Sequence, residues 1–163
     1  MAHRRPPRLP DSEYIGAVRI FLTMCTFDRH DAFTKASSVE IALRELLRTA
    51  SACTVEIVAY CFMPDHFHGL AAGGCEQSNV LGFCERFRQQ SAFHHRALDS
   101  QPLWQEGFFD RSLRKEEDTF EVVSYILGNP VRARLCKTAV EYPYSGSSRY
   151  SLEEITTFVQ WRP

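Results

Sequence analysis

The sequence predicts an α+β fold: a sandwich with the element order β-α-β-β-α-β around a central antiparallel sheet, followed by a C-terminal helix that carries Tyr125. Three observations support this prediction. The 163 residues suffice for one domain with its own hydrophobic core. Apolar residues alternate in some segments and recur at helical spacing in others. Glycine, proline and other turn-forming residues separate these segments.

The first part of the chain predicts a strand, a helix and a second strand. Residues 15–27 are rich in Val, Ile, Leu, Phe and Thr, which is typical of a strand. Ser37 and Ser38 can cap a helix, and apolar residues at positions 39–47 recur at helical spacing. Residues 53–62 begin with an alternation of apolar and polar side chains, which predicts the second strand.

A tight turn separates the second strand from a third. Met63-Pro64-Asp65 has turn-forming composition, and residues 66–72 predict a short strand that ends at Gly73-Gly74. Residues 79–98 then predict a second helix, because phenylalanines at positions 83, 87 and 93 form an apolar stripe. Its other face carries arginine and glutamine residues.

The last predicted elements are a fourth strand over residues 108–113 and a third helix over residues 116–127. Gly128-Asn129-Pro130 should end this helix, because a residue before proline is pushed away from helical geometry. The resulting order is that of the ferredoxin-like, or RRM-like, sandwich. In that topology the first and third strands are central and adjacent, so the third strand should lie in the middle of the sheet.

The domain organisation follows from composition. Residues 1–13 predict a basic, extended arm, since Arg4, Arg5 and Arg8 stand between prolines and no acid occurs in the first ten residues. The alternative is a terminus without a role. Residues 14–150 form the predicted domain, and residues 151–163 a C-terminal tail. The net charge of −1 by itself gives no indication of a nucleic-acid partner.

The six cysteines show no C-x-x-C spacing, so we expect reduced thiols that mostly serve as small core residues. Cys61 and Cys75 bracket two histidines, but their spacing matches no common zinc pattern. A signal peptide and a long apolar run are both missing from the sequence. These features predict a cytoplasmic protein without a membrane partner.

His66 and His68 are one residue apart in the predicted third strand. Alternate residues of a strand point to the same face, so both imidazoles should project from one side, with Asp65 directly before them. Histidine is a common metal ligand, and the pair could begin a divalent-metal site. The alternative is two partly buried histidines at a strand end.

Tyr125 and Asn129 are four residues apart, so on a helix they share a face. A tyrosine oxygen is a nucleophile once its proton is lost, and an asparagine oxygen is a neutral ligand for a hard cation. The alternatives are a helix cap for Asn129 and a core aromatic ring for Tyr125. The residues alone leave both possibilities open.

Two motifs together resemble a known family. Met63-Pro64-Asp65-His66-Phe67-His68 and the later segment 125–133 (YILGNPVRA) resemble the single-tyrosine HUH transposases (IS200-like), and among them the REP-associated tyrosine transposases. Segments 103–110 and 142–148 resemble other parts of this family. The resemblance extends from about residue 14 to residue 150.

This resemblance implies a function for each motif. His66 and His68 match the pair that binds Mg²⁺ or Mn²⁺, Tyr125 matches the nucleophile, and Asn129 stands where the family presents a variable third ligand. The implied enzyme cleaves and rejoins single-stranded DNA at or near hairpins through a 5′-phosphotyrosine intermediate. The alternatives are a hairpin-binding protein without chemistry and a metal hydrolase that releases both DNA ends. A monomer is favoured, and a homodimer is possible.

The residues that contact DNA should be arginines and aromatic or amide side chains outside the core. Each of them could instead be an ordinary surface residue. The candidates are Arg4, Arg5, Arg8, Arg86, Arg88, Gln89, Trp104, Arg111, Arg114, Arg132 and Arg134.

Overall fold

The computed structural model describes residues 8–114 and 119–160, and its centre is a five-stranded sheet with the strand order β4-β1-β3-β2-β5. All neighbouring strands are antiparallel. The α+β class is confirmed, and β3 is the middle strand, as the element order predicts. The strands are β1 (Arg19–Cys25), β2 (Val55–Met63), β3 (His66–Gly73), β4 (Phe109–Ser112) and β5 (Ser145–Gly146).

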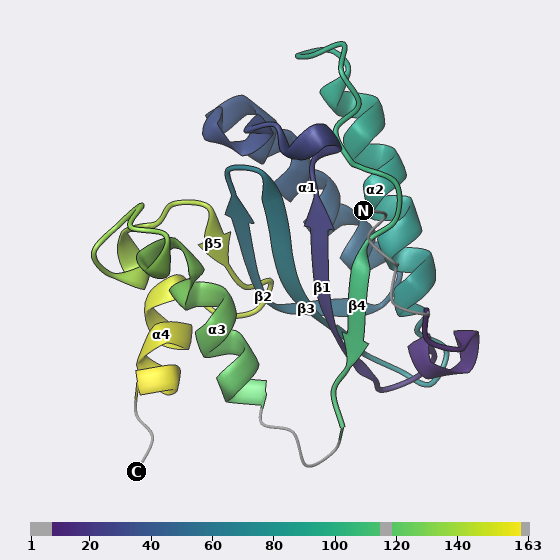
Figure 1. Ribbon diagram of the computed structural model, residues 1–163. Coiled ribbons are helices and arrows are strands. Elements are labelled where there is room, and N and C mark those ends of the chain that lie inside the picture. The colour runs from purple at the N-terminus through teal and green to yellow at the C-terminus, as the bar shows by residue number, and fades with distance from the viewer. Residues whose placement is uncertain (1–7, 115–118, 161–163) are drawn as a thin grey trace, which may run out of the picture.

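Helices cover both faces of the sheet (Figure 1). The helices α1 (Ala36–Ala52) and α2 (Val80–His95) pack on one face, and α3 (Thr119–Arg132) lies on the other with α4 (Leu152–Gln160) beside it. Short 3-10 helices occur at Asp11–Tyr14, Phe27–Arg29, Ala32–Thr34 and Ala139–Glu141. No helix within the described ranges is long and apolar enough to cross a membrane.

Several predicted segments change at their ends. The predicted start of the third helix lies partly in residues 115–118, outside those described. Most of the N-terminal arm also lies outside them, and its described end packs on the domain through Leu9 and the Asp11–Tyr14 turn. The predicted tail contains α4, whose Ile155 is buried. All six cysteines are described and are free.

Strand alternation divides the interior into two cores. Ile20, Leu22 and Met24 of β1 enter the larger core under α1 and α2, whereas Phe21 enters the smaller core under α3. On β3 the ring of Phe67 enters the larger core. Since neighbours on a strand point in opposite directions, the histidines on either side of Phe67 face the α3 layer.

The expectation that Gly128-Asn129-Pro130 ends the third helix was wrong. The helix runs through Pro130 to Arg132. Its buried stripe of Val123, Ile126 and Leu127 continues to Pro130, which is itself buried. Proline removes one helical hydrogen bond, but near the C-terminal end this packing outweighs the loss. The chain instead leaves the helix where the amide of Leu135 donates to the carbonyl of Pro130.

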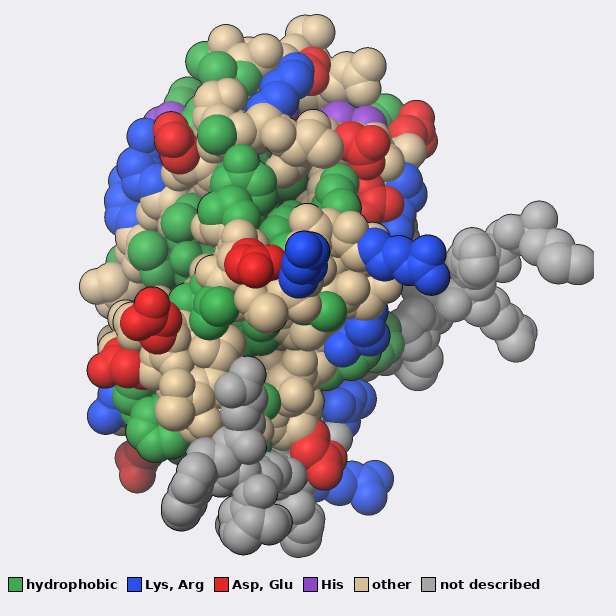
Figure 2. Space-filling model, turned by 90° about the vertical axis from the view of Figure 1, so that its left-hand side faces the viewer, with side chains coloured by type: hydrophobic (Ala, Val, Ile, Leu, Met, Phe, Trp, Pro, Cys, Tyr) green, Lys and Arg blue, Asp and Glu red, His purple; other side chains and the backbone are tan. Residues whose placement is uncertain are grey.

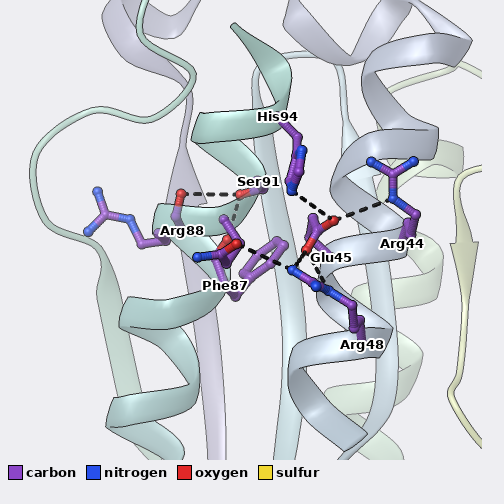
Figure 3. A network of polar contacts seen from close by, with 8 residues as sticks. Arg44, Glu45, Arg48, Phe87, Arg88, Ser91 and His94 are labelled. Carbon is purple, nitrogen blue, oxygen red and sulfur yellow. Dashed lines mark hydrogen bonds and ion pairs between the residues drawn. The ribbon is translucent and has the colours of Figure 1, made fainter. Parts of the chain in front are cut away.

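A buried carboxylate joins α1 to α2 on the larger-core side of the sheet (Figure 3). Glu45 is 2% exposed and lies 2.6 Å from Arg48, 3.4 Å from Arg44 and 3.7 Å from His94. Arg48 also donates to Gln90 of α2. A buried charge is tolerated only when such partners compensate for lost water, so this cluster fixes how the two helices face each other.

Candidate active site

The two histidines of β3 lie side by side on the α3 face of the sheet. Their ring centroids are 4.7 Å apart and the rings are nearly perpendicular. His68 is 7% exposed, whereas His66, nearer to the β2–β3 turn, is more open to solvent. The predicted pairing of the two side chains on one face is thus observed.

Each histidine presents its Nδ1 atom to an oxygen atom. Nδ1 of His66 lies 2.6 Å from Oδ1 of Asp65, and Nδ1 of His68 lies 2.8 Å from Oγ1 of Thr23. The other oxygen of Asp65 is held by Arg29 at 2.8 Å. A carboxylate or hydroxyl on one ring nitrogen orients the imidazole and leaves the other nitrogen as a ligand. The Nε2 atoms are therefore the candidate ligand atoms.

The protonation of the site suits this role. The pKa of His68 is lowered to about 4, chiefly by burial, with smaller contributions from the nearby His66 and Arg132. The ring is therefore neutral near neutral pH, as a metal ligand must be. Burial alone would raise the pKa of Asp65, but its hydrogen bond with His66 and the charge of Arg29 lower it overall, which keeps the carboxylate ionised.

Helix α3 brings Tyr125 to the histidine pair within one chain. The ring centroid of Tyr125 lies 5.8 Å from that of His68 and 5.9 Å from that of Phe21. The side chain is 48% exposed, so its phenol can reach a bound molecule. The stripe of α3 that packs on β2 and β3 places Tyr125 at the margin of the packed surface, where it is both held and accessible.

Arg132 covers the ring of Tyr125. Its guanidinium carbon lies 4.6 Å from the ring centroid, and its Nη2 donates to the carbonyl of Tyr125. Gly128 makes this possible, because a Cβ atom there would lie 2.7 Å from Nη1 of Arg132. Among the described residues Arg132 has no ion pair with a carboxylate, so an uncompensated positive charge lies beside the phenol.

Asn129 faces the helix backbone. Its Nδ2 donates to the carbonyl of Tyr125 at 3.2 Å, and no hydrogen bond within the described ranges joins it to either histidine. The described residues also contain no cluster of three or more His, Cys, Asp or Glu side chains that could hold a metal. The donor set therefore fits a divalent ion completed by solvent or substrate oxygens, not a closed structural site. The role of Asn129 as third ligand stays a prediction.

The predicted DNA-contact residues are spread over the molecule. Arg4 and Arg5 lie outside the described residues, and Arg8 lies 4.0 Å from Glu85 and over the ring of Phe108. Arg86, Arg88 and Gln89 belong to α2, which covers the face opposite the histidines.

Arg88 and Gln89 line a cavity of about 580 Å³ between α2 and residues 100–104. Trp104 is 8% exposed and donates its indole N–H to Ser91, which leaves little of its ring for a base.

The remaining arginines lie nearer to the histidine face. Arg111 is on β4 opposite Phe21, and Arg114 follows that strand. Arg134, in a left-handed conformation, follows α3. The side of α3 and α4 shows hydrophobic side chains in its middle, with basic and acidic side chains mixed around them (Figure 2).

Three residues of the site were missed by sequence reasoning: Phe21, Thr23 and Arg29. Thr23 pairs with His68 in the β1–β3 register. The sequence indicated only that the first strand should lie next to the histidine strand. The register itself could not be derived. Arg29 reaches Asp65 from a turn in which both it and Asp28 have positive φ angles, and no pattern in the sequence indicates that geometry.

The fold and the site together define a class: an α+β protein whose central strand presents a histidine pair to a tyrosine on a covering helix. Residues 16–129 match the model of the family described as "Transposase IS200 like", and the chain belongs to this family. A comparison with curated protein sequences found no match.

Two solved structures have a similar fold. A REP-associated tyrosine transposase bound to a REP hairpin has a TM-score of 0.70 and 20% identity, covering 89% of this chain and 82% of the other. A proposed transposase from Deinococcus radiodurans R1 has a TM-score of 0.52 and 18% identity, covering 81% of this chain and 92% of the other. These likenesses confirm the fold.

Proposed function

We propose that this protein is a metal-dependent transposase that cleaves and rejoins single-stranded DNA at or near hairpins through a 5′-phosphotyrosine intermediate. The observation that carries the proposal is the 5.8 Å separation of the Tyr125 and His68 rings in one chain. Family membership supports the reaction class, and the similar structure bound to a REP hairpin supports the substrate. A DNA substrate implies a cytoplasmic location.

The histidines and the tyrosine would have separate roles, metal binding for the first and covalent attack for the second. His66 and His68, with Asn129 as a third ligand, would hold Mg²⁺ or Mn²⁺. When bound, such an ion supplies positive charge to the oxygens of the scissile phosphate and helps to align it for in-line attack. Asp65 and Thr23, each in contact with an Nδ1 atom, would orient the two rings and leave both Nε2 atoms for the ion.

Tyr125 would supply the covalent step. Its Oη atom forms a bond to phosphorus while the bond from phosphorus to the 3′ oxygen breaks. The phenol loses its proton, and the departing oxygen takes one up to become a 3′-hydroxyl. A 3′-hydroxyl of another strand can reverse the step, since the phosphotyrosine conserves the phosphodiester energy.

Arg132 would assist at the nucleophile. A free tyrosine has a pKa of about 10, so at neutral pH its attack requires stabilisation of the developing phenolate and of the phosphate. The guanidinium over the Tyr125 ring places a permanent positive charge there. The guanidinium group of Arg132 can also donate a hydrogen bond to a phosphate oxygen.

The test uses a labelled DNA hairpin with single-stranded flanks, the full-length protein and Mn²⁺. A denaturing gel run with and without protease should show a protein–DNA adduct for the wild type. Tyr125→Phe should form none while binding the hairpin equally well. Tyr150→Phe is the matched control, because Tyr150 is also partly exposed and also lies under an arginine, Arg149. An adduct with Tyr125→Phe would exclude it as the nucleophile.

The same gel separates the alternatives. A hairpin-binding protein without chemistry would bind equally in EDTA and give no product with Mn²⁺. A hydrolase would release a free 5′-phosphate without an adduct. We favour a monomer as the active unit, because the histidines and the tyrosine meet without a second chain.

A further inference from the structure

Helix α3 leaves part of its own sheet face open. It packs on β2 and β3, and Figure 1 shows no described helix in front of β1 and β4. The exposure of β1 differs accordingly between its two faces. Ile20, Leu22 and Met24, under α1 and α2, are at most 1% exposed, whereas Thr23 and Cys25 on the α3 face are partly exposed.

The open area continues on to β4, where Phe109 is 42% exposed. Phe109 pairs with Thr23 and Arg111 pairs with Phe21, so both β4 side chains point to the α3 face. We call Thr23, Cys25, Phe109 and Arg111 the β1–β4 shelf.

The shelf adjoins the histidine pair and Tyr125. Thr23 pairs with Phe109 on one side and with His68 on the other, so these three residues form a row across three strands. The ring of Phe21 links the shelf to the nucleophile, because its centroid lies 6.5 Å from that of Phe109 and 5.9 Å from that of Tyr125. A molecule bound to Tyr125 can therefore extend directly on to the shelf.

The chemistry of this area suits single-stranded nucleic acid. The side chains that β1 and β4 direct to the α3 face come from Arg19, Phe21, Thr23, Cys25, Phe109 and Arg111. They include two arginines and no acid. The acid of β4, Asp110, points to the other face, where it accepts a hydrogen bond from Tyr14. An exposed aromatic ring with a cationic side chain beside it, as Phe109 has in Arg111 two residues along β4, is an arrangement on which an unpaired base can stack while a phosphate is neutralised.

We propose that the β1–β4 shelf binds the single-stranded DNA adjoining the scissile phosphate, with the neighbouring base stacked on Phe109 and its backbone phosphate beside Arg111. This inference rests on the proposed function, because it takes DNA as the substrate. It adds a positioning role for Phe109. Stacking tolerates any base, so the shelf orients the strand without reading its sequence.

The experiment uses Tyr125→Phe protein in EDTA, so that neither metal nor the covalent step is needed. The probe is a DNA hairpin with a thymidine tail in which 5-iododeoxyuridine replaces each position in turn. Irradiation should cross-link one tail position to Phe109, identified by mass spectrometry. Phe109→Leu, which keeps the apolar bulk but has no π face, should weaken binding of the tail about tenfold.

Two variants serve as controls. Phe109→Tyr retains the aromatic face and should bind as tightly as the parent protein. Phe93→Leu should also have no effect, since Phe93 is 63% exposed but lies on α2, across the sheet from the shelf. The proposal fails if Phe109→Leu binds the tail unchanged, or if the cross-links fall only on residues outside the shelf.

The outcome is independent of the covalent chemistry. Cross-linking to Phe109 in a protein that never forms an adduct would retain the shelf and reject the proposed reaction. An adduct in the wild type, together with no cross-link to Phe109, would retain the reaction and reject the shelf.

Discussion

At the scale of single residues, the histidine pair depends on the oxygen atoms behind it. Asp65 and Thr23 each face an Nδ1 atom, and Arg29 holds Asp65 in turn. The proposed metal ligands therefore belong to a chain of contacts that begins in the loop after β1. Substitutions one contact away from a ligand should act through its orientation.

Asp65→Asn tests this orientation. The amide cannot attract the Nδ1 proton of His66 as a carboxylate does, so Mn²⁺ affinity should fall about 10- to 100-fold. Electron paramagnetic resonance of free Mn²⁺ measures the affinity directly, without DNA or turnover. Asp31→Asn, at an exposed loop position, should leave it unchanged. Equal affinities in both variants would contradict the orienting role of Asp65.

Gly128→Ala tests the position of Arg132. A Cβ atom at 2.7 Å from Nη1 of Arg132 must displace that flexible side chain from Tyr125. Adduct formation should slow by about tenfold or more, as for loss of one preorganised charge in an active site. The melting temperature should be retained or rise, since alanine favours helices.

Arg132→Gln should slow adduct formation equally, and the double variant should be no slower than either single one. Additive effects would show that Gly128 acts by another route.

At the scale of elements, most boundaries could be derived from the sequence. Alternation and turn residues indicate β2, β3 and the turn between them, because these strands bury one face or both. The end of α3 could not be derived, since the preference against a helix before Pro130 is local and the packing that overrides it is not. Strand β5 has only two residues, which is too short for any periodic pattern.

His95 of α2 predicts a pH effect on the contact between α1 and α2. It is 1% exposed, its Nε2 lies 3.1 Å from Ser38 of α1, and its Nδ1 is buried without a partner among the described residues. Burial lowers its pKa; the charge of Asp99 opposes this shift, and His30 and Lys35 add to it. The folded chain therefore resists protonation of this ring.

The sign of the effect follows from proton binding. Below the ordinary histidine pKa of about 6.5, the unfolded chain takes up a proton at this position that the folded chain does not, so stability falls as the pH falls. His95→Gln should reduce the decline in melting temperature between about pH 7 and pH 5. Thermal unfolding at a series of pH values measures it. An unchanged slope would contradict the assignment to His95.

At the scale of the whole molecule, one chain contains both halves of the candidate site. The ring centroids of His68 and Tyr125 lie 5.8 Å apart within this one chain. We therefore expect that mixing Tyr125→Phe protein with His66→Ala protein restores no adduct formation, as gel analysis of the mixture would show. Recovery of activity in the mixture would mean that the tyrosine of one chain serves the histidines of another.

Residues of the site that stand in local sequence motifs could be predicted, whereas those brought in by strand pairing could not. His66, His68 and Tyr125 stand in motifs that the family resemblance singled out, and the structure brings their three rings together. Phe21 and Thr23 become part of the candidate site, and Phe109 part of the proposed shelf, only through strand register, which links positions far apart in sequence. The same limit explains why the nine described residues among the predicted DNA contacts, chosen by residue type, are scattered over both faces.

The two cores also differ in the secondary-structure elements that pack on them. Strand β3 is fixed by both, whereas α3 and α4 rest on the smaller one alone. In hydrogen exchange, the amides of α3 should therefore open at a lower free energy than those of β3, as a separate cooperative unit. In mild denaturant, adduct formation should disappear while the sheet and the larger core persist. Because the proposed nucleophile belongs to this layer, we expect the molecule to lose catalytic competence before its sheet unfolds.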